Sequence, residues 1–214
     1  MGVAPANVIN GLKIISEPFV QRENCWNEIS YSWYYLKKNY GVDTFFTVDF
    51  ATRILPQYTA QGLYIQSAPY EQTLLISCVS GCAVIIIVDL REDSLSYLRY
   101  NRFILDDCPD RRSVYIPRGC AYGFVTLVDN TQLDFKADNY CKMEFEKTYN
   151  LLDPYYMIKV PYPGRDGEDI LLSTLLSQGK LIMSVHDRCA PWLMDVATPK
   201  SPKIYETEEA TELP

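Results

Sequence analysis

Two short apolar runs, residues 73–79 and 83–90, most strongly limit what this chain can fold into. Both are rich in β-branched residues, and each is too short to be one of a pair of packed helices. Only Gly81 and its two neighbours separate the runs, so we predict two buried strands joined by a tight turn. These strands are expected to form the floor of an all-β domain. We expect polar side chains of the adjoining stretch to line a cavity in front of that floor: Gln61, Tyr64, Gln66 and Gln72.

The rest of the chain predicts further short strands, and turn residues such as Pro, Gly, Asp and Asn interrupt the later ones. We expect strands at residues 44–53, 97–105, 113–116, 122–127 and 132–137, and an edge strand at residues 11–20 that could pair with a second subunit. Many short strands at nearly regular spacing are typical of a β-sandwich or barrel.

Helical periodicity is clearest near the N-terminus. Trp33 and Leu36 belong to an apolar series at helical spacing, which predicts an amphipathic helix over residues 24–40. Asn24 is the expected N-cap and Gly41 the expected stop signal. We interpret the aromatic residues of this helix as core packing.

The chain length favours one domain followed by a tail. A chain of 214 residues that is 48% hydrophobic can build one substantial core. We assign residues 1–197 to that domain, with a wrapping loop at 151–163 and one or two helical turns at 170–177. Residues 198–214 are mostly Pro, Thr, Glu and Lys and bury too little apolar area to offset the entropy of ordering, so we predict a disordered tail.

Charge and cysteine content narrow the functional classes. With 20 basic and 27 acidic side chains and no basic cluster, the chain is not expected to bind nucleic acid. The seven cysteines show no repeated pairing pattern, which favours free thiols in a reducing cytoplasm. Neither a leader pattern nor an apolar stretch of membrane-spanning length is found, so we expect no membrane association.

Metal and cofactor chemistry are not expected. His186 is the single histidine, and metal sites of small β-barrels use two or more. The glycine-rich patterns that hold phosphates or dinucleotides and the serine nucleophile pattern are missing from the sequence. Cys78 and Cys82 lie in apolar surroundings and are interpreted as inert buried thiols.

Five ordered motifs carry a family resemblance. QGLYIQ at residues 61–66 stands where the family has RGLHYQ, and GCAVIIIVDLREDSLSY at residues 81–97 corresponds to G-x-x-x-D-V-x-V-D-x-R-x-x-S-x-x-Y. Residues 116–127, IPRGCAYGFVTL, correspond to IPxGFAHGFxxL. Residues 151–161 correspond to W-x-D-P-x-x-x-I-x-W-P, and SVHD at residues 184–187 to S-x-K-D. The chain therefore resembles the dTDP-4-dehydrorhamnose 3,5-epimerases.

The resemblance extends from about residue 12 to residue 192. It implies a cupin-like jelly roll with a few short helices and a homodimer that pairs through N-terminal strands. It also implies a nucleotide-linked 4-keto-6-deoxyhexose as ligand, a place in deoxysugar and surface-polysaccharide biosynthesis, and no cofactor.

The resemblance also locates the candidate catalytic residues. Tyr64 occupies the position of the family's histidine base, and Asp187 keeps the carboxylate that orients it. Phe135 occupies the position of the tyrosine that returns a proton to the opposite face of the sugar. Leu74 and Gln61 occupy the positions of a lysine and an arginine. Base, acid and cations are thus substituted together, and we predict no ordinary 3,5-epimerisation.

Three hypotheses remain from the sequence. The first is an altered epimerase that uses Tyr64, Asp187 and Tyr122; Tyr64 would then act as a phenolate, which needs nearby positive charge. The second is a catalytically inactive relative that binds a nucleotide sugar. The third is a scaffold whose cavity is closed by Tyr64, Tyr122 and Phe135. The expected ligand contacts are Gln61, Gln66, Gln72 and Arg118, where Arg118 either meets a diphosphate or is simply solvated.

Overall fold

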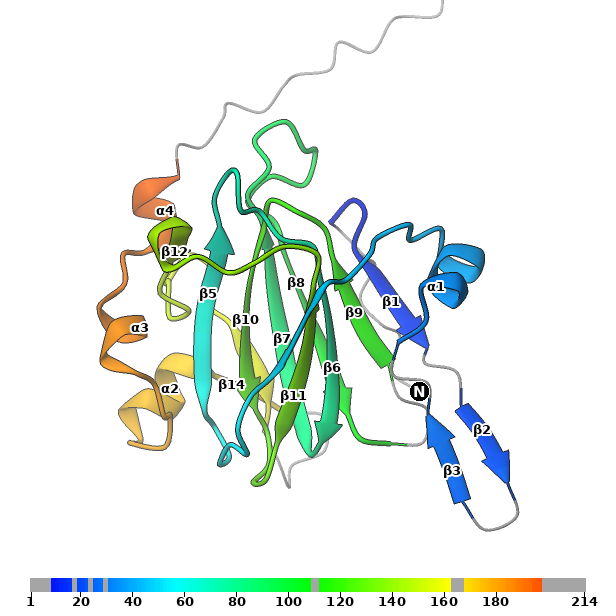
Figure 1. Cartoon of the computed structure of the whole chain (residues 1–214). Coiled ribbons are helices and arrows are strands. Elements are labelled where there is room, and N and C mark those ends of the chain that lie inside the picture. Colours follow the sequence, from blue (N-terminus) through cyan, green and yellow to red (C-terminus); the bar gives the residue numbers. More distant parts are fainter. Residues whose placement is uncertain are drawn as a thin grey trace, which may run out of the picture.

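Two antiparallel sheets face each other in the computed structural model of the chain (Figure 1). The structure describes residues 9–16, 19–22, 25–28, 31–108, 112–162 and 168–197, with the backbone alone at 19–22 and 25–28. The first sheet has the order β1 (Lys13–Ser16), β9 (Arg112–Ile116), β6 (Leu74–Ser80), β11 (Gln132–Ala137) and β4 (Val48–Ala51). The second has the order β12 (Glu146–Thr148), β5 (Ala60–Gln66), β10 (Cys120–Thr126), β7 (Cys82–Asp89) and β8 (Tyr100–Asp106). The predicted all-β sandwich is confirmed.

The two apolar runs form strands as predicted, but they do not lie side by side in one floor. β6 pairs with β9 and β11 in the first sheet, whereas β7 pairs with β10 and β8 in the second. The chain crosses between the sheets at Gly81, whose φ is +81°. An apolar strand can be buried by any neighbouring element that covers it, so the two runs alone do not predict which strands pair with them.

The sandwich interior is filled from both sheets. Ile76 of β6 and Ile85 and Ile87 of β7 are fully buried there, together with Leu133 and Phe135 of β11. Alternate residues of β7, such as Ile86, face the other way. Because the second sheet is covered on both faces, β7 is apolar along almost its whole length.

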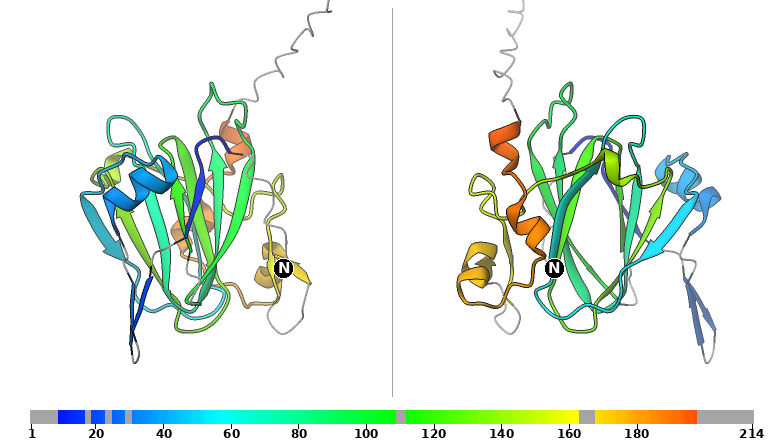
Figure 2. Two further views of the ribbon diagram at one scale, coloured as in Figure 1. Left: turned by 90° about the vertical axis from the view of Figure 1, so that its right-hand side faces the viewer. Right: turned by 60° about the vertical axis from the view of Figure 1, so that its left-hand side comes forward.

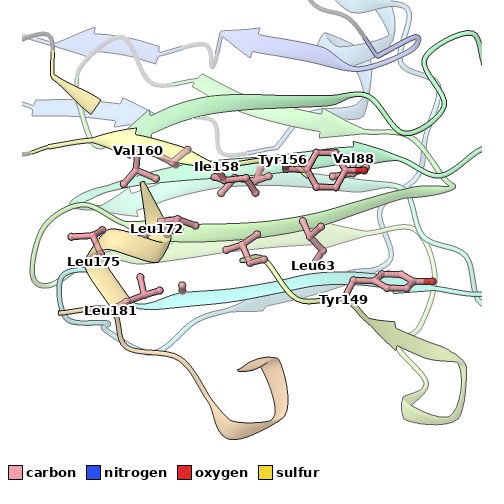
Figure 3. Packing of buried hydrophobic residues seen from close by; sticks show 14 of the residues in the cluster. Leu63, Val88, Tyr149, Tyr156, Ile158, Val160, Leu172, Leu175 and Leu181 are labelled. Atoms are coloured by element: carbon pink, nitrogen blue, oxygen red, sulfur yellow. The ribbon is translucent and has the colours of Figure 1, made fainter. Parts of the chain in front are cut away.

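The outer face of the second sheet is covered by the C-terminal part of the chain. Figure 3 shows side chains of the cluster that packs there, including Leu63, Val88, Tyr156 and Leu172. The covering elements are β13 (Lys159–Pro161), β14 (Asp169–Leu171), α2 (Leu172–Ser177) and α4 (Leu193–Val196), whereas α3 (Val185–Cys189) lies against β5. A 3₁₀ turn, η1 (Met143–Phe145), precedes β12. The predicted loop at 151–163 wraps this face and ends in β13.

The predicted N-terminal helix is wrong in its first half. Backbone pairing forms a hairpin from β2 (Phe19–Arg22) and β3 (Cys25–Glu28), and helix α1 covers only Trp33–Tyr40. Ser32 is the N-cap, because its side chain accepts a hydrogen bond from the Tyr35 amide. Asn24, the predicted cap, lies outside the described residues, whereas Gly41 ends the helix with φ +64° as predicted.

Helix α1 covers the outer face of the first sheet, on the opposite side of the sandwich from the C-terminal helices (Figure 2). β1 is an edge strand paired with β9 and is shorter than predicted. Residues 170–177 are the end of β14 followed by α2. The predicted tail, residues 198–214, lies outside the described part of the chain. No helix within the described ranges is long and apolar enough to cross a membrane.

Candidate functional site

Two glycines bring the central strands of the site together. Gly62 on β5 has φ +95°, and a Cβ there would lie 2.7 Å from the Tyr122 carbonyl oxygen. A Cβ on Gly123 of β10 would lie 2.7 Å from the Gln61 carbonyl oxygen. The register shifts here, so that Tyr64 pairs with Tyr122 while Gln61 pairs with Phe124. This bulge, which needs two residues without side chains, sets the positions of Tyr64 and Tyr122.

Tyr64 points into the sandwich. Its neighbour Leu63 packs in the outer cluster, so Tyr64 faces the opposite side of the sheet. There its ring meets Tyr122 edge-on, with ring centroids 6.1 Å apart. Tyr122 in turn packs against the interior cluster.

The Tyr64 hydroxyl donates a hydrogen bond of 2.8 Å to Oδ1 of Asp187. Asp187 lies on α3 and is 1% exposed. Ser184, the N-cap of α3, donates to Oδ2 of Asp187 across 2.7 Å and accepts from the Asp187 amide across 2.9 Å. The carboxylate is therefore held by two hydroxyl donors in one orientation.

The electrostatics of the site keep Tyr64 protonated. Burial, the hydrogen bond to Asp187 and the charge of Asp187 all raise the pKa of the Tyr64 phenol well above its ordinary value. Burial and the charge of Glu146 raise the pKa of Tyr122 in the same direction. Both side chains are neutral phenols at physiological pH.

Aromatic rings continue from Tyr122 across the interior. Phe135 lies 5.9 Å from Tyr122 between ring centroids, and its other side stacks on Phe50 of β4 at 5.0 Å with an interplanar angle of 6°. We call Tyr64, Tyr122, Phe135 and Phe50 the aromatic row. The rings run from the second sheet to the edge of the first, where Phe135 is buried and Phe50 is 40% exposed.

Gln66 lies next to the aromatic row on β5, on the same face as Tyr64. Its amide nitrogen is 3.3 Å from Oε2 of Glu146 on β12 and 3.1 Å from Sγ of Cys141. Its carbonyl oxygen accepts from the Lys142 amide across 3.1 Å. These contacts fix Gln66 at the edge of the sheet.

Gln72 and Arg118 lie near each other but bind a different segment. Gln72 donates to the carbonyl oxygen of Asn139 across 2.8 Å, and Arg118 pairs with Asp138 at 3.0 Å. Asp138 also accepts from the Thr73 amide across 2.7 Å. Neither predicted contact bonds to Tyr64 or Asp187 within the described residues, and Arg118 is more than half exposed.

The positions of the family's cations carry no charge. Leu74 is 3% exposed and packs in the interior cluster. Gln61 contributes its backbone to the close contact with Gly123. The described ranges contain no group of three His, Cys, Asp or Glu side chains that could hold a metal.

A hollow of about 520 Å³ lies outside this site. Ile65 of β5 and Ser67, directly after β5, line it; these residues alternate with Tyr64 and Gln66, so the hollow opens on the opposite face of the sheet. Its other walls include Tyr97, Tyr149 and Leu193. None of the predicted site residues is among those that line this hollow, so it is separate from the interior site.

Sequence reasoning missed several members of the site. Ser184 was named only as the first letter of SVHD, although a serine three residues before an acidic residue is the spacing of a helix cap. Glu146 and Cys141 had no motif signal, and neither did the stacking of Phe50 on Phe135. Gly62 and Gly123 are visible as glycines in strands, a pattern that often marks a bulge or close backbone approach.

The fold and the interior site together define a class of protein: an all-β sandwich with a buried carboxylate at the inner edge of its second sheet. The family model described as dTDP-4-dehydrorhamnose 3,5-epimerase matches residues 6–195. The chain belongs to this family.

Individual relatives agree with that assignment. A dTDP-4-dehydrorhamnose 3,5-epimerase from Mycobacterium tuberculosis is 34% identical over 107 residues, which cover 50% of this chain and 52% of that protein. The match thus spans about half the length of this curated relative. The Bacillus anthracis enzyme, solved with TDP and PPi bound, superimposes with a TM-score of 0.73 at 27% identity, covering 87% of this chain and 96% of that one. The Legionella pneumophila enzyme, at 24% identity, covers 87% of this chain and 89% of that one with a TM-score of 0.72, and shows the common fold.

Proposed function

We propose that this protein is a divergent member of its family that binds a nucleotide-linked 4-keto-6-deoxyhexose inside the sandwich, in deoxysugar and surface-polysaccharide biosynthesis. The family match over residues 6–195 and the TDP-bound relative support this ligand class. We further propose that the protein does not carry out ordinary 3,5-epimerisation, because the groups for that chemistry are substituted together. Tyr64, Asp187 and Tyr122 remain the residues to test at the reacting part of the sugar.

The observation that carries this proposal is the direction of the Tyr64–Asp187 hydrogen bond. A base must accept a proton, but the Tyr64 phenol donates its own to Asp187. Moving that proton onto the carboxylate works against an ordinary difference of about 6 pKa units between tyrosine and aspartate, or about 8 kcal/mol. Burial and the charge of Asp187 raise the pKa of the Tyr64 phenol further. The phenolate form is therefore too rare to serve as an efficient base.

The opposite face of the site lacks its proton donor as well. Phe135 has no hydroxyl and is enclosed between Phe50 and Tyr122. The position of the family's lysine, which would stabilise the developing enolate, is taken by Leu74, which is apolar and buried. A positioned general base or acid is worth about 10²–10⁴ in rate and a stabilising charge about 10²–10³, so their joint loss removes most of the ordinary catalysis.

A second candidate function is a catalytically inactive scaffold subunit. The aromatic row favours it, because Tyr64, Tyr122 and Phe135 contact one another in series on the inner face, where a sugar would need space. In that case Tyr64, Tyr122 and Phe135 close the cavity.

Further properties follow as proposals from the family and the composition. We propose that residues 1–197 act as one domain and that the protein is a homodimer. We propose a cytoplasmic location without a nucleic-acid partner, which agrees with the free thiols of Cys82, Cys120, Cys141 and Cys189 and with a formal net charge of −7.

Calorimetry and isotope exchange separate these functions. Titration with dTDP-, CDP-, GDP- and UDP-linked sugars should give binding for at least one nucleotide, and Gln66→Ala should weaken it. Incubation with a 4-keto-6-deoxy nucleotide sugar in D₂O should give no deuterium at C3 or C5. Deuterium incorporation would overturn the loss of epimerisation. Thermal and calorimetric silence across the whole panel would instead leave the scaffold as the function.

A further inference from the structure

The hollow of about 520 Å³ on the outer face of the second sheet lies apart from the interior site. Ile65 of β5 and Leu90, directly after β7, line it and are only half-buried. Two phenols, Tyr97 and Tyr149, belong to its walls. Its volume is within the range of ordinary ligand pockets. What fills this hollow is independent of the ligand proposed for the interior site.

Helix α4 forms one wall of the hollow. Leu193 and Val196 of this helix and Ala197 directly after it line the space, and Val196 is 55% exposed. Residues 198–214 continue from Ala197, so the chain leaves the described part of the structure at the rim of the hollow. Seven residues of extended chain span up to about 25 Å. The residues that follow Ala197 can therefore reach the hollow without any rearrangement of the domain.

One short part of residues 198–214 has the side chains to fill such a space. Ile204 and Tyr205 are adjacent, whereas Leu213 stands alone among polar residues and Pro. A tyrosine suits a half-open site, because its ring can be buried while its hydroxyl stays in water. The pair Ile204 and Tyr205 is therefore the natural anchor of this segment.

The charges around the hollow match those beside the anchor. Lys147 and Glu92 line the hollow, and both side chains are exposed. In the segment, Lys203 comes directly before the apolar pair and Glu206 directly after it. Exposed ion pairs add little affinity, but complementary charges set the direction in which a segment binds. The match places Glu206 at Lys147 and Lys203 at Glu92.

We propose that residues 203–206 of the chain dock in this hollow, with Ile204 and Tyr205 inside it and Glu206 beside Lys147. A segment tethered at the rim has an effective concentration on the order of millimolar. An anchor that binds as a free peptide with a Kd of about 0.1 mM is then docked for about 90% of the time. Tethering thus favours the same chain over a separate partner. The disorder predicted for the tail applies to the residues on either side of the anchor.

The test uses the full chain with one photoreactive residue. Tyr205→p-benzoylphenylalanine keeps an aromatic ring at the anchor, and irradiation links that ring to the C–H bonds that lie against it. Mass spectrometry of the digested protein should place the links at residues that line the hollow, such as Tyr149 and Leu193. Leu213→p-benzoylphenylalanine, later in the same segment, is the control and should show no such preference. Links from position 205 that avoid the hollow, or that match those from position 213, overturn the proposal.

Charge reversal tests the orientation of the docked segment. Lys147→Glu should lower the yield of the link from position 205 by about two- to fivefold, because it turns an attraction to Glu206 into a repulsion. Lys147→Glu combined with Glu206→Lys should restore the yield. Lys38→Glu changes an exposed lysine of α1, on the other side of the sandwich, and should leave the yield unchanged. A yield that the double reversal does not restore overturns the contact between Glu206 and Lys147.

Isotope mixing identifies the chain that supplies the anchor. In a mixture of ¹⁴N- and ¹⁵N-labelled protein, links confined to single copies support docking within one chain. Links between light and heavy copies overturn it and make a second copy the occupant. Because the hollow and the interior site lie on opposite faces of the sheet, none of these outcomes decides the proposed function.

Discussion

Tyr64 and Asp187, 123 positions apart in the chain, share a hydrogen bond of 2.8 Å in which the phenol is the donor. The hydroxyl of Ser184 completes the coordination of the same carboxylate. This arrangement places a neutral phenol beside the carboxylate at the position where the family resemblance leads us to expect an imidazole. The predictions below begin with this pair.

Tyr64→Phe should destabilise the fold by about 1–3 kcal/mol, because it leaves a buried carboxylate oxygen without its donor. Urea unfolding measures the change. Tyr122→Phe is the matched control, since no hydrogen bond of the Tyr122 hydroxyl is found within the described residues, and it should change stability less. Equal stability of Tyr64→Phe and the wild type would contradict the role of this bond.

Tyr64→His with Phe135→Tyr should restore a measurable part of the proton exchange. An imidazole at position 64 would lie beside Asp187, and a positioned base contributes about 10²–10⁴ in rate. Deuterium incorporation into a 4-keto-6-deoxy nucleotide sugar, followed by mass spectrometry, measures the gain. The same double variant with Asp187→Asn should lose it. A double variant that binds the sugar but exchanges no deuterium would mean that the scaffold no longer positions these groups.

Gly62→Ala should destabilise the fold by about 2–4 kcal/mol. The new Cβ would lie 2.7 Å from a backbone oxygen and 2.8 Å from the Cα of Gly123, and the residue would keep a positive φ. Gly179→Ala is the control, because its φ is also positive at +67° but nothing lies within 4 Å of the added Cβ. It should cost only about 1 kcal/mol, the ordinary penalty of the left-handed conformation. Similar losses for the two variants in urea unfolding would rule out the steric explanation.

Asp89 should make the fold sensitive to acid. Burial opposes ionisation of this carboxyl, but hydrogen bonds from Arg91, Ser94 and Ser96 outweigh it and hold its pKa below the ordinary value. A depressed pKa contributes stability that is complete above the unfolded pKa of about 3.9 and is lost as the pH falls through the folded value.

Asp89→Asn should therefore lower stability at neutral pH by about 3–5 kcal/mol, because it breaks a buried ion pair with Arg91. It should also flatten the loss of stability below about pH 4. Urea unfolding at a series of pH values measures both effects. Exposed Asp43, paired with Lys37 on the surface, gives the control: Asp43→Asn should change stability far less than Asp89→Asn. If Asp89→Asn left the loss of stability at low pH unchanged, that loss would come from other groups.

Much of the fold could be predicted from local pattern. The strands at β6, β7, β10 and β11 lie close to their predicted bounds, because runs of β-branched residues between turn residues are a local signal. The first half of the predicted N-terminal helix failed for the opposite reason. There the apolar spacing fits a helix, but pairing between β2 and β3 decides the backbone conformation.

The sequence predicted candidate residues for the site, but it did not predict which side chains these residues contact. Tyr64 contacts both Asp187 and Tyr122, and Tyr122 contacts Phe135; their role in a site stays a prediction. Gln72 and Arg118, from the same reasoning, bind residues 138–139 instead. Motif spacing identifies which positions belong to a site, whereas side-chain partners depend on neighbours that are remote in the chain.

The sequence by itself determined the all-β class, the family and the loss of an imidazole, a phenol and two cations at matched positions. These are properties of residue identity and of short-range pattern. Only the tertiary structure decided that β6 and β7 lie in opposite sheets, that Tyr64 donates to Asp187, and that the rings of Tyr64, Tyr122 and Phe135 lie in one series of contacts. Each of these depends on strand pairing and burial between distant segments. Whether a phenol acts as an acid or as a base depends on the groups around it, which the residue identity does not give.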